Sequence, residues 1–101
     1  MVVSYPVIFT ATHDSKDTYL AYISDFDGMT EGYGLEDAVH MARDYMGCSL
    51  YDKADNEIPK ASTISDIDVT KGAFADNGES IVSLVEFDLD VFKRRMNKKV
   101  D

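Results

Sequence analysis

The sequence has few of the features that mark secreted, membrane or repetitive proteins. Cys48 is the one cysteine among 101 residues, so no disulfide can form within the chain. No stretch approaches the ~20 consecutive apolar residues of a membrane helix, and residues 1–6 lack the basic flank and apolar run of a signal peptide. No internal repeat or low-complexity segment is present. We therefore expect a soluble, cytoplasmic protein that folds without disulfides or a structural metal.

Basic residues are also scarce. Ten Lys and Arg stand against nineteen Asp and Glu, which gives a net charge of −9. A phosphate backbone rewards clustered positive charge, so this composition disfavours direct nucleic-acid binding by the body of the domain. A negative field instead favours basic partners, and it acts on the speed and orientation of docking more than on final affinity. Composition alone leaves open that the charge only keeps the protein in solution.

The first third of the chain predicts an antiparallel meander. β-branched and aromatic residues alternate with period two, and polar turn residues separate the runs. The predicted strands cover residues 2–12, 18–24 and 29–33, with turns at 13–17 and 25–28. Pro6 cannot donate a ladder hydrogen bond, which places this part of the first strand on a sheet edge or near the start of the strand.

The period then changes to about 3.6 residues, which predicts one long helix over residues 35–53. Glu36 and Asp37 lie in its first turn, where the helix dipole favours acidic side chains. Residues 53–80 are irregular, and Pro59 stops any continuing helix. Within them, residues 62–68 predict one short helical turn capped by Ser62 or Ser65.

The last part of the chain predicts a strand and a short helix. Residues 80–87 form the strand, and the nearly continuous apolar run Ile81–Val85 suggests a central strand covered on at least one face. Asp88 or Asp90 can cap a final helix that reaches about Asn97. Residues 1–101 are thus predicted to be a single α+β domain, with a small, mainly antiparallel three- to four-stranded sheet in β-β-β-α-β-α order and one long helix packed on one face.

Three motifs in the chain occur together at specific offsets. They are the opening strand Tyr-Pro-Val-Ile-Phe (5–9), the run from Tyr19 to Gly32 containing Asp-Phe-Asp-Gly and Thr-Glu-Gly, and the helix start Leu-Glu-Asp-Ala (35–38). Together they resemble the N-terminal domain of HicB-type antitoxins. Two mild departures are Ser24, where the family usually has proline, and Gly34, where it usually has a Thr or Ser cap.

This resemblance implies a partly degenerate RNase H-like domain that binds and blocks HicA, a small basic ribonuclease. Many HicB proteins continue into a DNA-binding module, and this sequence stops at Asp101, where such a module would begin. The chain is therefore expected to be either a truncated protein or a one-domain member, with DNA bound only weakly or through a missing module. The basic run Lys93–Lys99 is better explained as balancing the helix dipole than as a DNA contact.

The acidic loop 25–28 with Glu31 is the first candidate contact surface, because loops often carry binding. Alternatively, Phe26 folds into the core while Asp25 and Asp27 simply form the turn. Acids on the outer face of the long helix can extend the surface or be merely solvated, and tyrosines are enriched at interfaces. The predicted partner-binding residues are Tyr22, Asp25, Phe26, Asp27, Glu31, Tyr33, Asp37 and Asp44.

No catalytic or cofactor motif emerges, so we expect a protein that is not an enzyme and binds no metal or cofactor. Carboxylates at Asp25, Asp27, Glu31, Glu86, Asp88 and Asp90 are numerous enough for a two-metal nuclease, but helix capping already explains the last two. His13, His40 and Cys48 have no motif spacing. Two functions remain: an antitoxin for a HicA-like toxin, and a stand-alone, self-associating HicB-like module without a toxin partner. A homo-oligomer is expected.

Overall fold

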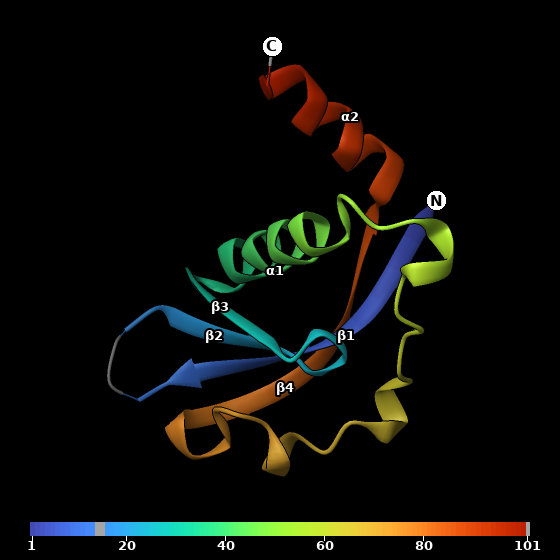
Figure 1. Ribbon diagram of the computed structural model, residues 1–101. Helices are drawn as coiled ribbons and strands as arrows, with labels where there is room; N and C mark the ends of the chain where they lie inside the picture. The colour runs from blue at the N-terminus through green and yellow to red at the C-terminus, as the bar shows by residue number, and fades with distance from the viewer. Residues whose placement is uncertain (14–15, 101) are drawn as a thin grey trace.

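The computed structural model describes residues 1–13 and 16–100, and it shows a four-stranded antiparallel sheet with one long helix lying across one face (Figure 1). The elements are β1 (Val2–Thr12), β2 (Thr18–Ile23), β3 (Gly28–Tyr33), α1 (Leu35–Leu50), β4 (Gly78–Asp88) and α2 (Leu89–Val100). The strand order is β3-β2-β1-β4. This confirms the predicted element order and fold class. The predicted turn at 13–17 includes Asp14 and Ser15, which lie outside the described residues.

The core lies between α1 and the sheet. Tyr5, Val7 and Phe9 alternate along β1 and are buried on the face toward the helix. The helix contributes small and flexible side chains at intervals of about one turn, namely Ala38, Ala42, Met46 and Leu50, all 0–1% exposed. The small residues bring α1 close to the strands. Within the described residues, no helix is long and apolar enough to cross a membrane.

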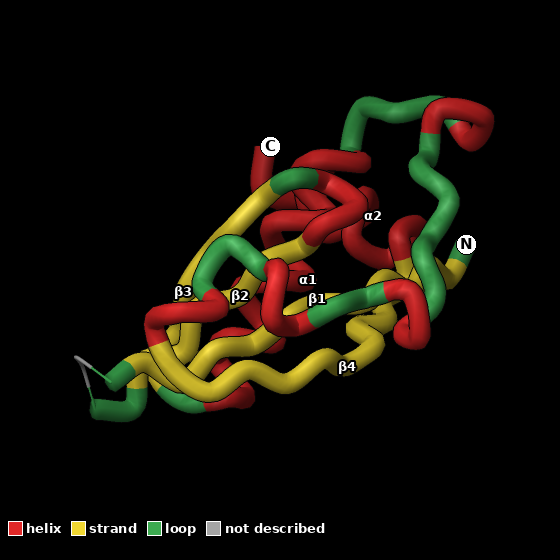
Figure 2. Tube along the Cα trace, turned by 90° about the horizontal axis from the view of Figure 1, so that it is seen from below, coloured by secondary structure: helices red, strands yellow, loops and turns green. Residues whose placement is uncertain are grey.

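The opposite face of the sheet is crossed by the irregular segment between α1 and β4 (Figure 2). Ile8 and Thr10 of β1 point to this side and are buried, and Gly72 packs against the Ile8 side chain. The segment contains four 3-10 turns: Asp55–Glu57, Ile64–Asp66, Val69–Lys71 and Ala75–Asn77. The third quarter of the chain therefore forms a second covering layer with little regular structure.

The short turn predicted within residues 62–68 is confirmed as Ile64–Asp66, but its predicted cap is wrong. Thr63 is the residue before the turn, and no side chain caps it. Ser62 is unavailable for capping because its hydroxyl donates a hydrogen bond to Asp25, at 2.6 Å. The predicted boundaries also shift: α1 ends at Leu50 rather than residue 53, and β4 begins earlier, at Gly78.

The prediction that the last strand is central is wrong, since β4 lies at the edge of the sheet and, among the described strands, pairs with β1 alone. β1 is an interior strand, between β2 and β4. Pro6 is nevertheless placed as its chemistry requires. It pairs across from Leu84 of β4, whereas the pairing of β1 with β2 begins only at Ile8. Pro6 thus lies in the half of β1 that has a neighbour on one side.

The helix α2 continues from the end of β4 and projects beyond the sheet (Figure 1). The Asp88 carboxylate accepts hydrogen bonds from the amides of Asp90 and Val91, at 3.0 and 3.2 Å, so Asp88 is the cap, one of the two that the sequence left open. Leu89 is buried. The Phe92 ring packs against Gly47 of α1 and occupies the space that a larger side chain at this position would need. This contact fixes the first turns of α2 against α1.

Candidate functional site

The face of β3 that points away from α1 carries large, exposed side chains. Gly28 and Gly32 face α1, so the alternating residues Met29, Glu31 and Tyr33 point away from it. The side chains of Tyr33 and Met29 are 81% and 51% exposed. An aromatic and a methionine with an acid between them are suited to protein contact, because Tyr and Met are enriched at interfaces.

Tyr22 and Asp27 extend this exposed patch across β2 and the following turn. Tyr22 pairs across the strands with Met29, and its hydroxyl donates a hydrogen bond to Asp27 Oδ1 at 3.0 Å. That bond holds the proton on the phenol and raises the pKa of Tyr22 above its ordinary value. Asp27 adopts the left-handed conformation, with φ of 47°, and ends the 3-10 turn Ser24–Phe26. The turn therefore presents an exposed carboxylate beside an oriented tyrosine.

Asp37 fixes the junction between β3 and α1. Its carboxylate accepts a hydrogen bond from the Tyr33 amide at 2.9 Å, while the Gly34 amide donates to the Asp17 carbonyl at 2.6 Å. Gly34 has φ of 84°, a conformation that glycine adopts without strain. These contacts hold the backbone on both sides of Tyr33, so its exposed ring projects from a defined position.

A shallow hollow of about 380 Å³ lies on the other side of β3, between this strand and α1. Met41 and Asp44 of α1 line it together with Thr30 of β3. The surface around the strand thus has acids and methionines on both sides of the edge. We call Tyr22, Asp27, Met29, Glu31, Tyr33, Asp37, Met41 and Asp44 the β3 edge surface.

The structure brings six of the eight predicted residues into the β3 edge surface and places Asp25 and Phe26 elsewhere. Both oxygens of Asp25 accept hydrogen bonds from Ser62, one from its amide at 2.9 Å and one from its hydroxyl at 2.6 Å. The Phe26 ring packs edge-on against Tyr5, with centroids 4.8 Å apart. Asp25 thus holds the turn to the covering layer, while Phe26 packs against the core, which agrees with the alternative that it folds inward.

The Asp25 carboxylate should therefore contribute to stability. We expect Asp25→Ala to lower the free energy of unfolding by about 1–3 kcal/mol, because two hydrogen bonds to a charged group are lost. Urea denaturation measures the change, and amide exchange should accelerate at Ser62. Asp76→Ala is the matched control, since Asp76 is exposed. Equal stability of the two variants would contradict the structural role of Asp25.

Sequence reasoning missed Met29 and Met41. Met29 lies on a strand face that has no covering helix, and Met41 is on the side of α1 that borders β3. A methionine at a non-core position of an amphipathic element is a usable signal, because its flexible thioether suits adaptable contact surfaces.

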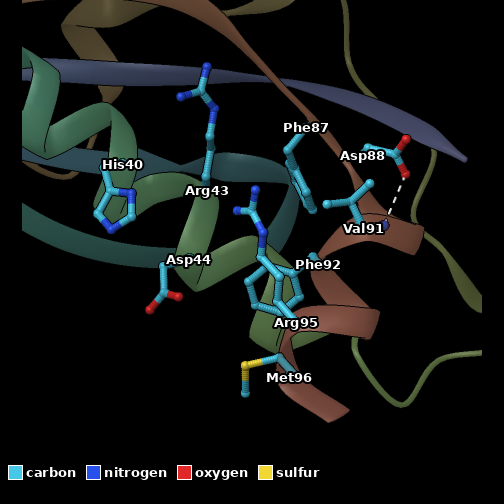
Figure 3. Close-up of a pocket in the computed structure, with 9 residues that line it drawn as sticks. All are labelled: His40, Arg43, Asp44, Phe87, Asp88, Val91, Phe92, Arg95 and Met96. Carbon is cyan, nitrogen blue, oxygen red and sulfur yellow. Dashed lines mark hydrogen bonds between the residues drawn. The ribbon is translucent and has the colours of Figure 1, made fainter. Parts of the chain in front are cut away.

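A second hollow, of about 400 Å³, lies where α1, the end of β4 and α2 meet (Figure 3). Phe87 and Phe92 form part of its apolar floor, with ring centroids 6.3 Å apart. Arg43 and Arg95 supply positive charge, although the Arg43 Nε donates to the Glu86 carbonyl at 3.0 Å. This hollow contains no nucleophile paired with a base, and its two aromatic rings join α2 to the end of β4.

The carboxylates at the end of β4 are used structurally. Asp88 caps α2, and Asp90 accepts a hydrogen bond from the Met1 amino group. That contact lowers the pKa of the Asp90 carboxyl. Within residues 1–13 and 16–100, no group of three or more His, Cys, Asp and Glu side chains is placed to hold a metal ion.

Comparison with known proteins shows the fold of the chain. No protein-family model and no curated protein matches the chain. Among solved structures, the chain is similar to one from a toxin-antitoxin complex of Streptococcus pneumoniae, with a TM-score of 0.76 and 23% sequence identity. The similarity covers 91% of this chain and 73% of that one. The chain therefore shares its fold with a component of a toxin-antitoxin complex.

Proposed function

We propose that this protein is the antitoxin of a type II toxin-antitoxin system, and that it neutralises a HicA-like ribonuclease by covering its RNA-binding and catalytic face. The observation that carries the proposal is the shared fold with a chain of the S. pneumoniae toxin-antitoxin complex over 91% of the sequence. The HicB-like motifs at residues 5–9, 19–32 and 35–38 point the same way, and they fall on β1, on β2 with β3, and on the start of α1.

Charge favours the antitoxin role over the toxin role. A fold shared with one chain of a complex does not by itself say which component that chain is. An enzyme that cuts RNA must bind a polyanion, which rewards clustered Lys and Arg. This protein has a net charge of −9, so it would repel RNA and attract a cationic ribonuclease. We therefore assign it the inhibitory role.

The β3 edge surface is the proposed contact with the toxin. Tyr33 and Met29 supply apolar area that a partner can desolvate, and the acids Glu31 and Asp44 can pair with basic side chains. Carboxylates in these positions would occupy sites on the toxin that RNA phosphates otherwise fill. Inhibition would thus be steric and electrostatic, with no chemistry performed by this protein.

Co-expression with any small basic protein that is encoded next to this one tests the proposal. We expect the two proteins to co-purify through an affinity tag placed on the basic partner, and the complex to survive gel filtration at moderate salt. A parallel co-expression with Tyr33→Ala should yield markedly less complex, because the most exposed aromatic ring of the surface is lost. Failure of the unmodified pair to form a complex would favour the self-associating module without a toxin partner.

A further inference from the structure

The outer edge of β4 is a long strand edge with no strand beside it in the described parts of the chain. β4 pairs with β1 over all 11 of its residues without a bulge. Proteins usually protect such edges with lysine, proline, bulges or a covering element. β4 contains neither lysine nor proline, and its only charged side chains are Glu79, Glu86 and Asp88. Its regular geometry thus remains available for pairing.

The direction of the backbone hydrogen bonds identifies which residues of β4 point outward. The Leu89 amide donates to the Met1 carbonyl at 2.8 Å, and the His13 amide donates to the Asn77 carbonyl at 3.1 Å. These bonds continue the β1–β4 register at both of its ends, so the odd-numbered residues of β4 direct their amides and carbonyls toward β1. The even-numbered residues, Ser80 to Glu86, direct theirs away from it. The bond from Arg43 to the Glu86 carbonyl agrees with this assignment.

The same edge exposes apolar side chains. Ile81 and Leu84 are each 52% exposed, although both lie in the apolar centre of the strand. Their side chains point to opposite faces of the sheet, because they differ by an odd number of residues. A strand added beside β4 would therefore cover apolar area on both faces, besides pairing the outward amides and carbonyls.

We propose that two copies of this chain associate by pairing their β4 strands antiparallel about a two-fold axis through Ser83. In this antiparallel pairing the two-fold axis runs perpendicular to the sheet. A residue and its symmetry mate therefore lie on the same face of the sheet. Directly opposed residues also share a face. One residue must therefore lie opposite its own symmetry mate, because neighbouring residues of a strand point to opposite faces. Ser83 is the middle residue of Gly78–Asp88, so an axis there gives the longest overlap.

This register brings compatible side chains together. Val82 lies opposite Leu84 of the second copy, and Ile81 lies opposite Val85, so apolar residues meet on both faces. Glu86 lies opposite Ser80, and no acid is directly opposite another, which would be destabilising. The Glu86 carbonyl is not free to pair with a second copy, because it already accepts a hydrogen bond from Arg43. The central pairs between residues 82 and 84 therefore carry the backbone hydrogen bonds of the dimer.

The resulting assembly is a continuous eight-stranded sheet, since each copy contributes four strands and β4 meets its symmetry mate at the centre. β3 forms the opposite edge of each sheet, so the β3 edge surface stays open in both copies. The dimer does not depend on the proposed function. If that function is correct, the dimer presents two separate toxin-binding surfaces.

Disulfide trapping tests the register directly. In a Cys48→Ser background, Ser83→Cys places two thiols opposite each other at a non-hydrogen-bonded pair, where the Cα atoms lie about 4.5 Å apart, within disulfide range. We expect this variant to form a covalent dimer under mild oxidation. Ser80→Cys is the matched control, because in this register Ser80 lies opposite Glu86 of the second copy, six residues away from its own symmetry mate. Equal cross-linking of the two variants, or none at Ser83→Cys, would overturn the proposed pairing.

Light scattering after gel filtration supplies the second arm. The unmodified chain should elute as a dimer at about 100 µM, and Val82→Pro should be monomeric because it removes an outward amide while keeping the bonds to β1. Circular dichroism and the denaturation midpoint check that this variant is folded. A monomeric unmodified chain would contradict the proposal, as would a folded Val82→Pro variant that remains a dimer. Toxin binding by Val82→Pro is a separate readout and should be retained.

Discussion

Replacing Glu31 and Asp44 by lysine is expected to slow association with the basic toxin by about 10- to 100-fold at low ionic strength. Both side chains are exposed and lie on the two sides of β3, one on the strand and one on α1. The substitutions change the net charge from −9 to −5 and place positive charge where the partner is positive. Stopped-flow or surface-based kinetics measures the association rate, and its salt dependence should become weaker than that of the unmodified chain.

A matched variant separates local from overall charge. Asp52→Lys with Asp76→Lys gives the same net charge, but these exposed acids lie outside the β3 edge surface. When both double variants are compared at about 0.15 M ionic strength, we expect this control to slow association by no more than about three-fold, because charges farther from the contact than the ~8 Å Debye length are then largely screened. An equal loss in both double variants would show that overall charge, rather than the β3 edge surface, controls docking.

Gly32→Val is expected to lower the free energy of unfolding by about 1–3 kcal/mol, the range for overpacked sites. A Cβ at Gly32 would lie 2.5 Å from the Ala38 amide nitrogen and 2.7 Å from its Cα, so a side chain there meets the helix backbone rather than a movable side chain. β3 or α1 must shift to admit it. Urea denaturation measures the loss, and affinity for the toxin should also fall because both sides of the β3 edge surface move.

Glu31→Val is the control for strand propensity. It places the same side chain on the adjacent residue of β3, but on the outer face of the sheet, where no helix covers it. Its stability should stay within about 0.5 kcal/mol of the unmodified chain, as is usual for exposed sites. If both valines destabilise the protein equally, the close approach of β3 to α1 is not the cause.

Local patterns predicted most of the fold, because its elements follow from nearby residues. The period of two gave the meander, and the change to 3.6 located the start of α1 at Leu35. The cap at Asp88 was readable because it needs only the next three residues. The position of β4 was predicted wrongly, since the run Ile81–Val85 is equally apolar whether a strand is central or pairs with a second chain through its free edge.

The candidate site was less predictable because its geometry depends on distant contacts. Asp25 and Asp27 are equivalent in sequence, yet one binds Ser62, 37 residues away, and the other is exposed and bonded to Tyr22. Nothing near Asp25 in the sequence indicates that partner. Met29 and Met41 were missed for a related reason, since the exposure of Met29 and the half-buried place of Met41 beside β3 follow from the position of β3 at the sheet edge. Charge and tyrosine content predict the kind of partner, and the sheet topology adds which of the predicted residues lie together at β3.

The most direct test of the antitoxin role is the rate of RNA cleavage by the purified basic partner as this protein is added. We predict that cleavage falls to background at one copy of this chain per toxin, and that the Glu31→Lys, Asp44→Lys variant requires a clear excess. Fluorescent RNA and gel readouts both report the rate. Undiminished cleavage in the presence of excess chain, with both proteins folded, would contradict the antitoxin function.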